Sequence, residues 1–587
     1  MNLLHSNFLK YFYSTLFFST LILFTFQHNS DKLQSELRKG RQLKILVYSP
    51  SVSWSHAQFL GRIADTLVDA GHEVHFVKYI MSPLLLQRNE TTKVTKIHII
   101  EKGLENNEIM DIKDQPMVSE SFTKKRQYLT LFDHPMHQFG PMMAMSCKET
   151  LKQPILLQKL TNERFDVGIA EMYDYCPSAL FHKIGVRTKL TAYAIPLFQA
   201  TSRIFGIPNF PSFMPNVMVP IPGLEHSFVS RSINFYNELF DWLWTGDITL
   251  RHQEPVIRAE FGEDFPDLKE LQKNVSLAFF NSNPFLELPR PISNKIIYIG
   301  GLVDDHTSGG NKILEPVIIQ NKQVLFKFPS FTQKIQKIMD EAVTGVILFS
   351  FGSLADTAKL NNKMKSAIIK AFGRFPQIQF LWKLDSDTIK NLTKLPNVHT
   401  FEWLQQPAIL GHPNLRAFIS HCGQNSLTES ARAGVPILGI PLFGDQFYNA
   451  DVAQKLGIGI QIDVNELSGP NAEQVLVEAI EMILYQPKYQ QNAKIISKKL
   501  KLTPFSPTER LVKWVEFAAE FGDLPELNLP GEKEMNWFVY YSLDVILFSI
   551  IVLVILFWVT FKCFKWILSS LIINWFEKIE SEEKKQK

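Results

Sequence analysis

The apolar positions in the long middle of the chain fall into two series of short runs. The first series predicts buried strands at 43–50, 72–77 and 165–171. Between the first two strands, Phe59, Ile63 and Leu67 recur at every fourth position, which predicts a helix with one buried face. Gly71 suits the end of that helix. The order strand, helix, strand is typical of a doubly wound parallel sheet.

The second series predicts buried strands at 346–353, 377–384, 417–423 and 434–441. A proline-rich segment that ends in two glycines, 281–302, separates the two series and indicates a connection between domains. We therefore predict an α/β protein with two Rossmann-like domains facing a cleft. The first spans 43–283, the linker 284–311 and the second 312–520. Ligands of such sheets bind at the carboxyl ends of the strands.

The two ends of the chain carry longer apolar runs. Lys10 precedes an apolar run at 11–26, which predicts a signal sequence over 1–29 without an evident cleavage site. A second run is unbroken by charge over 545–561, and it predicts a transmembrane helix over 538–561. Acidic residues precede this run and lysines follow it. The positive-inside rule then places the tail, 562–587, in the cytosol and the body in the lumen, as a single-pass type I protein held by membrane lipid.

Short motifs agree with that topology. Asn89, Asn274 and Asn391 begin N-glycosylation sequons, and all three lie in the predicted lumenal body. Lys584 and Lys585, near the carboxyl terminus, resemble the dilysine retrieval signal of endoplasmic-reticulum membrane proteins. We therefore expect a glycoprotein of the endoplasmic-reticulum membrane.

Composition excludes several other classes of protein. The 587 residues carry a net charge of +3 without a basic block, which argues against a nucleic-acid partner. Four cysteines, Cys147, Cys176, Cys422 and Cys563, are too few for a disulfide scaffold and form no C-x-x-C zinc pair. The sequence leaves open whether Cys147 and Cys176 pair, and it does not decide whether the chain forms homo-oligomers.

The most specific motif is the segment WLQQPAILGHPNLRAFISHCGQNSLTESARAGVPILGIPLFGDQ, 44 residues from Trp403 to Gln446. It resembles the nucleotide-sugar signature of the UDP-glycosyltransferase superfamily in length and in its two end residues. FSFGS, NSNPFLELPRP and YIGGL are similar to elements of the UDP-glucuronosyltransferase family. The resemblance implies a GT-B fold, a UDP-sugar as co-substrate, and no cofactor or metal.

By this resemblance, four side chains hold the donor's phosphates: Ser353, His421, Asn425 and Ser426. The chemistry agrees, because a diphosphate needs donors at a strand end or at the start of a helix. Gly423 lies between these groups and permits close approach of the backbone to the ligand.

The same resemblance assigns the rest of the donor. Trp403 stacks on uracil, Gln406 pairs with the edge of the base, and Glu429 accepts from the ribose hydroxyls. Asp445 and Gln446 bind sugar hydroxyls. The family's usual W-x-P-Q reads W-L-Q-Q here, which leaves the pose of Gln406 open.

Catalysis of sugar transfer with inversion needs a base for the acceptor. His56 lies in the predicted loop after the first strand, where the family places its catalytic histidine. Glu171 occupies the position of the carboxylate partner, which is Asp in many relatives, and Asp174 is the alternative partner.

The resemblance implies transfer of a sugar, with glucuronic acid as the leading candidate, to a small lipophilic hydroxyl, amine or carboxyl, as in detoxification. UDP-glucose is the alternative donor. A catalytically silent nucleotide-sugar-binding membrane protein is the rival from another class, and His56 with an acidic partner argues against it. A single predicted span besides the signal argues against a transporter.

Overall fold

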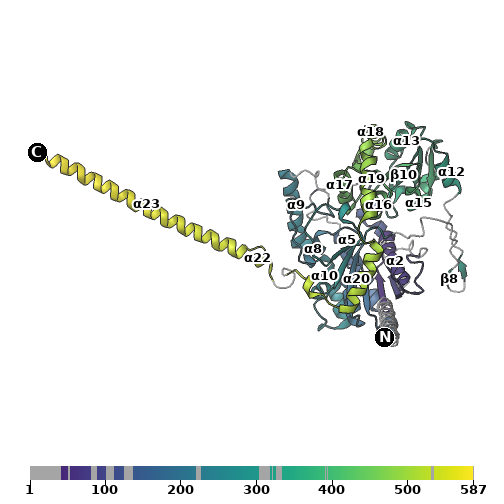
Figure 1. Cartoon of the computed structure of the whole chain (residues 1–587), viewed down its shortest axis with the longest axis horizontal. Coiled ribbons are helices and arrows are strands. Elements are labelled where there is room, and N and C mark those ends of the chain that lie inside the picture. The colour runs from purple at the N-terminus through teal and green to yellow at the C-terminus, as the bar shows by residue number, and fades with distance from the viewer. Residues whose placement is uncertain are drawn as a thin grey trace, which may run out of the picture.

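The computed structural model shows two α/β domains and one long helix that leaves them on one side (Figure 1). It describes residues 41–50, 53–80, 89–100, 112–123, 128, 136–219, 227–302, 317–319, 322–324, 333–390, 392, 394–529 and 535–585. The predicted signal sequence and the sequon asparagine at 391 lie outside these residues.

A sheet of seven parallel strands forms the first domain, in the order β3-β2-β1-β4-β5-β6-β7. Its strands are β1 (Lys44–Ser49), β2 (Glu73–Tyr79), β3 (Lys96–Ile100), β4 (Val167–Ala170), β5 (Thr188–Tyr193), β6 (Leu277–Phe280) and β7 (Ile296–Tyr298). The chain runs outward from β1 to one edge and then returns to β4 on its other side. The point between β1 and β4 is therefore the place where a doubly wound sheet binds its ligand.

Helices cover both faces of this sheet. They are α2 (Trp54–Asp69), α4 (Pro116–Ser119), α5 (Met136–Leu151), α6 (Pro154–Glu163), α7 (Cys176–Lys183), α8 (Gln199–Ile204), α9 (Phe228–Phe240), the π-helical turn η2 (Asp241–Thr245), α10 (Ile248–Phe261) and α11 (Leu268–Lys273), with short turns η1 (Ile112–Asp114) and η3 (Pro284–Leu286). Helix α2 buries Phe59, Ile63 and Leu67 as predicted, and Gly71 behind it has φ of 92°. A disulfide between Cys147 and Cys176 joins α5 to the first residue of α7.

The second domain is built on six parallel strands in the order β12-β11-β10-β13-β14-β15. They are β10 (Val346–Ser350), β11 (Gln379–Lys383), β12 (Val398–Phe401), β13 (Leu415–Ser420), β14 (Ile437–Gly439) and β15 (Gly459–Gln461). A separate hairpin pairs β8 (Val317–Ile319) with β9 (Lys322–Val324). The prediction of two Rossmann-like domains is confirmed.

The helices of this half are α12 (Gln333–Glu341), α13 (Asn362–Gly373), α14 (Ser386–Lys390), α15 (Gln406–Leu410), α16 (Gln424–Ala433), α17 (Gln446–Lys455), α18 (Ala472–Tyr485), α19 (Pro487–Leu502) and α20 (Pro507–Phe521), with turns η5 (Thr357–Lys359), η6 (Val464–Ser468) and η7 (Pro525–Leu527). Helix α20 returns to the first domain, where Leu511, Val515 and Ala518 are fully buried in its core. Two domain boundaries therefore differ from those expected. The predicted linker, 284–311, supplies β7, and the predicted second domain ends on a helix of the first.

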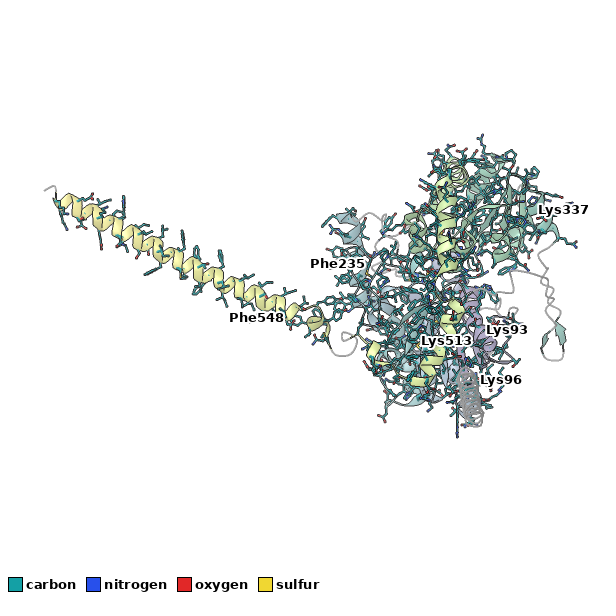
Figure 2. The ribbon with its side chains drawn as sticks, in the orientation of Figure 1. Lys93, Lys96, Phe235, Lys337, Lys513 and Phe548 are labelled. Atoms are coloured by element: carbon teal, nitrogen blue, oxygen red, sulfur yellow. A yellow bond between two sulfur atoms is a disulfide. The ribbon has the colours of Figure 1, made fainter. Side chains whose placement is uncertain are left out.

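The carboxyl-terminal segment is longer in the structure than its apolar run. After the short α22 (Trp537–Tyr540), α23 runs unbroken from Leu543 to Lys585, through the residues predicted as a tail. Among the described residues it is the one helix long and apolar enough to cross a membrane. Figure 2 shows this helix extending away from the body, with Phe548 near its start. Such a helix is compatible with a single-pass membrane protein.

Candidate active site

His56 and Glu171 meet at the carboxyl ends of β1 and β4. The helix α2 begins after Ser53, so His56 lies in its first turn rather than in the preceding loop. Glu171 follows β4 directly and is fully buried. Its Oε2 lies 2.8 Å from Nδ1 of His56, and its Oε1 accepts from the backbone N–H of Ala194 at 2.7 Å. Both oxygens are therefore occupied, and Nε2 of His56 is the ring nitrogen left for a substrate.

Electrostatics favour the protonated form of His56. Burial by itself lowers the pKa of His56, but the charge and hydrogen bond of Glu171 outweigh it, and Asp445 adds to their effect. The net result is a raised pKa, so the carboxylate stabilises the imidazolium that forms when His56 takes a proton. The alternative partner, Asp174, points elsewhere and accepts from the N–H of Cys176 at 2.8 Å. Burial raises the pKa of Asp174 to about 7.

In the second domain, the imidazole of His421 lies between two glycine backbones. A Cβ on Gly352 or on Gly423 would come within 2.6 Å of Nε2 of His421. Gly352 also has φ of +78°, a conformation that other residues rarely adopt. Both positions therefore require glycine for the ring to sit beside the start of α16.

The start of α16 suits an anion. Gly423 is its N-cap and provides no side-chain cap, so the first N–H groups of the helix have no such partner. Asn425 and Ser426 lie in this first turn, and Ser353 follows β10, which pairs with β13, the strand before α16. Burial, reinforced by the charge of Lys383, lowers the pKa of His421 to about 3. His421 is therefore a neutral donor near pH 7, and the helix terminus supplies the positive potential.

The predicted nucleoside residues lie together at one end of the site. Nζ of Lys383 lies 4.7 Å from the ring centre of Trp403, which is partly exposed. Gln406 begins α15, and its Nε2 donates to Glu429 Oε2 at 2.7 Å and to Ser426 Oγ at 3.2 Å. The structure thus joins the predicted base, ribose and phosphate residues in one hydrogen-bonded group.

Asp445 and Gln446 lie at the start of α17, but they face different partners. Asp445 accepts from Asn449 at 2.8 Å, and its charge acts on His56. Burial raises the pKa of Asp445 to about 6. Gln446 is buried, and its Oε1 accepts from the N–H groups of Leu442 and Phe443. This oxygen therefore stabilises the preceding loop, and only the amide nitrogen of Gln446 remains for a sugar.

Contacts between the domains bring these two sets of residues together. Nδ2 of Asn281, after β6, donates to Oδ1 of Asn425 at 2.7 Å. Arg62 on α2 lies 3.9 Å from Glu429. Tyr448 on α17 donates to Glu287 at 2.6 Å. The pair His56 and Glu171, called the dyad below, therefore lies opposite the residues predicted to bind the UDP-sugar, at a close contact between the two domains.

A cavity in the first domain adjoins the dyad. Its lining mixes apolar side chains, among them Met172, Phe198, Ile204 and Met218, with polar ones such as Gln199, Thr201, Asn216, Asp241 and Gln272. The ring of Tyr173 packs edge-on against His56, with centroids 5.5 Å apart. Its hydroxyl is buried, and burial together with the neighbouring charge of Glu171 raises the pKa of Tyr173 well above its usual value.

Sequence reasoning missed Arg62, Tyr173, Asn281, Lys383 and Asn449. Four of them act through contacts between segments distant in sequence, and a single chain offers no signal for those. Asn449 lies four positions after Asp445, and that spacing alone is compatible with one turn of a helix. Of the sequon residues, Asn89 and Asn274 are exposed.

Two acidic groups resemble metal sites in composition, but each has protein partners. Glu73, His75 and Glu163 lie close together at the amino end of the first sheet. Nearby lysines pair with both carboxylates. The second group is the sequence Asp-Ser-Asp at 385–387. Its Asp385 accepts hydrogen bonds from the backbone N–H and the hydroxyl of Thr357. Neither group adjoins the dyad.

Comparison with known proteins shows which proteins this chain is similar to. The family model described as "UDP-glucoronosyl and UDP-glucosyl transferase" matches residues 43–321 and 326–575. A Caenorhabditis elegans protein named as a UDP-glucuronosyltransferase, ugt-48, is 31% identical over 88% of this chain and 93% of its own. UDP-glucuronosyltransferase 3A1 of Bos taurus is 27% identical over 91% of this chain and 94% of its own.

Two further similarities concern the donor and the fold. UDP-glucosyltransferase 2 of Dactylopius coccus is 30% identical over 65% of this chain and 67% of its own. The solved structure of the glycotransferase of kitacinnamycin aligns with a TM-score of 0.52 at 16% identity, covering 81% of this chain and 99% of that one, and shows the GT-B fold. Enzymes of this family use a UDP-sugar as a substrate and need no cofactor. The chain belongs to the UDP-glycosyltransferase family and is a UDP-glycosyltransferase.

Proposed function

We propose that this enzyme transfers a sugar, with inversion, from its UDP form to a hydroxyl, amine or carboxyl of a small lipophilic acceptor. The observation that carries the proposal is the pairing of the partly buried His56 with the buried Glu171, beside a cavity lined by apolar and polar side chains and within charge reach of Asp445 in the other domain.

The reaction is a single displacement at the anomeric carbon. Nε2 of His56 takes the acceptor's proton as the acceptor oxygen or nitrogen bonds to that carbon, and the bond from the carbon to the UDP oxygen breaks. Glu171 holds the proton on Nδ1 and stabilises the imidazolium. The N–H groups at the start of α16, with the neutral imidazole of His421, receive the charge that develops on UDP. At the end of the step the acceptor's proton is on Nε2 of His56.

Glucuronic acid is the leading donor sugar, because the relatives that span most of the chain are named as UDP-glucuronosyltransferases. Glucose is the second candidate, and one observation favours it. The sugar is expected between the dyad and Asp445, where the charged groups described are two carboxylates and His56. A hexuronate carboxylate would meet like charge there, whereas a neutral hexose would not.

A panel of radiolabelled UDP-sugars with phenol acceptors, on microsomes that contain the full chain, tests this function. Product from at least one UDP-hexose or UDP-hexuronate is expected. Binding of UDP without any transfer would contradict the function and leave a silent nucleotide-sugar-binding protein.

We further propose that α23 anchors the body on the lumenal side of the endoplasmic-reticulum membrane. Truncation before Trp537 is expected to release a glycosylated body into the supernatant of alkaline carbonate extraction. Retention of the truncated chain in the pellet would show that another segment, such as an uncleaved signal, crosses the bilayer.

A further inference from the structure

Helix α9 has an inverted polarity. Ser230, Asn234, Asn237 and Asp241 recur along one face of α9 and into η2, and all four are buried. The opposite face presents large apolar side chains to the outside: Phe228, Val229, Phe235, Tyr236, Leu239, Trp242, Leu243 and Trp244. Phe228 is 76% exposed and Tyr236 is 56% exposed. A helix that meets water normally shows the reverse pattern.

Internal bonds hold the polar face inward. Nδ2 of Asn234 donates to the carbonyls of Pro211 and Met214 at 2.7 and 2.6 Å. Asn237 donates to the carbonyl of Tyr128 at 2.7 Å, and Arg203 pairs with Asp241. Rotation of the helix would break these bonds, so the apolar face is a stable part of the surface. Exposed apolar surface of this extent marks a partner site.

Contacts with the anchor indicate what covers that face. The indole of Trp242 packs against that of Trp537 in α22, with ring centres 5.8 Å apart. The hydroxyl of Tyr540 donates to the carbonyl of Gly206 at 3.1 Å, and α23 starts three residues later. Figure 1 shows α9 on the side of the body from which α23 leaves, and Figure 2 shows Phe235 on that side. The apolar face is therefore continuous with the start of the membrane anchor.

We propose that the apolar face of α9 and η2 lies in the headgroup and upper acyl region of the bilayer beside α23. Interfacial helices bind lipid in this way, with tryptophan and tyrosine at the boundary. The inference rests on the membrane anchoring proposed above and goes beyond it, because it adds a second contact made by the catalytic domain itself.

This contact also gives lipophilic acceptors a route to the dyad. Asp241 begins η2 and Gly246 follows its end, and both line the cavity that contains Tyr173. A molecule dissolved in the upper acyl region of the bilayer would thus reach the cavity beside the lipid-facing helix without crossing water.

The test uses the full chain, one copy per lipid nanodisc, with the exposed Cys563 changed to serine. A cysteine introduced by Phe235→Cys carries an environment-sensitive NBD label. Val343→Cys provides the matched control, because Val343 is 93% exposed and follows α12 on the opposite side of the body (Figure 1). We expect blue-shifted emission and quenching by doxyl-labelled lipid at the first site, and neither at the second. Tyr236→Cys is expected to behave as Phe235→Cys does and guards against a local folding defect.

An unquenched, water-like label at both α9 sites would overturn the proposal. A label that is shielded in lipid-free detergent in proportion to protein concentration would also overturn it, because a second copy of the chain would then cover the face. Neither readout depends on sugar transfer, so a failure of the membrane contact can be distinguished from a failure of the proposed activity.

Discussion

Glu171 holds Nδ1 of His56 at 2.8 Å although 115 positions separate them in the chain. The second oxygen of the same carboxylate accepts the N–H of Ala194, so the charge is fixed in place from both sides. This relationship fixes the orientation of the base and raises its pKa, and it makes the pH dependence of the enzyme predictable.

The rate should rise with pH as His56 loses its proton, because only the neutral imidazole acts as a base. Its raised pKa puts that rise in kcat/KM above pH 6.5, the ordinary value for histidine. In Glu171→Gln only the charge of Asp445 still opposes the lowering effect of burial on the pKa of His56, so the rise should move to lower pH. Turnover should fall as well, because glutamine has one acceptor oxygen and cannot serve both Nδ1 and Ala194. An unmoved pH profile would exclude the coupling.

Trp403→Ala should weaken UDP binding. Loss of base stacking costs about 1–3 kcal/mol, which corresponds to roughly 5- to 150-fold in the dissociation constant measured by calorimetry. Trp403→Phe keeps a flat ring and serves as the matched control, with a much smaller loss. Equal dissociation constants for the wild type and a folded Trp403→Ala variant would remove this side chain from the uracil site.

Gly423→Ala should disrupt the phosphate end without touching the dyad. The added methyl would lie 2.6 Å from Nε2 of His421, and Gly352 blocks the ring from the other side. UDP affinity should therefore fall, while uridine, which has no phosphate, should bind nearly as before. Equal losses for both ligands would indicate a general folding defect instead.

Tyr173→Phe should act on the acceptor and, through the neighbouring Glu171, on the pH profile of the rate. The change keeps the ring that packs against His56 and removes a buried hydroxyl that lies against the carboxylate of Glu171. If that hydroxyl binds the acceptor, the acceptor KM should rise by about 2- to 13-fold, equivalent to about 0.5–1.5 kcal/mol. The donor KM should not change. A rise in the donor KM instead would place the hydroxyl on the sugar side.

Strands with continuous apolar runs were predictable, and those without them were not. The runs around Val346 and Leu415 became β10 and β13, at the centre of the second sheet. By contrast, β12 reads VHTF and is only partly buried, and β3 exposes Ile97 and Ile99. Edge strands such as these carry little periodic signal.

A local motif predicts the relative positions of some candidate site residues, but no local motif predicts which residues meet between the two domains. The spacing of His421, Gly423 and Asn425 on one strand and helix is a property of a single segment. The contact of Asn281 with Asn425 depends on how the domains dock, which no local pattern reports. The burial of the asparagines of α9 was not predicted for a related reason. An amphipathic pattern is normally interpreted with the polar face toward water, and in α9 the polar face is buried.

The most direct test of the account is the turnover of His56→Ala on an aliphatic alcohol, with UDP affinity measured in the same preparation. Such a hydroxyl cannot ionise unaided near neutral pH, so the reaction depends on a base. We expect turnover to fall by about 10²- to 10⁴-fold while the dissociation constant for UDP stays unchanged. Near-normal turnover on that alcohol would contradict the assignment of His56 as the base.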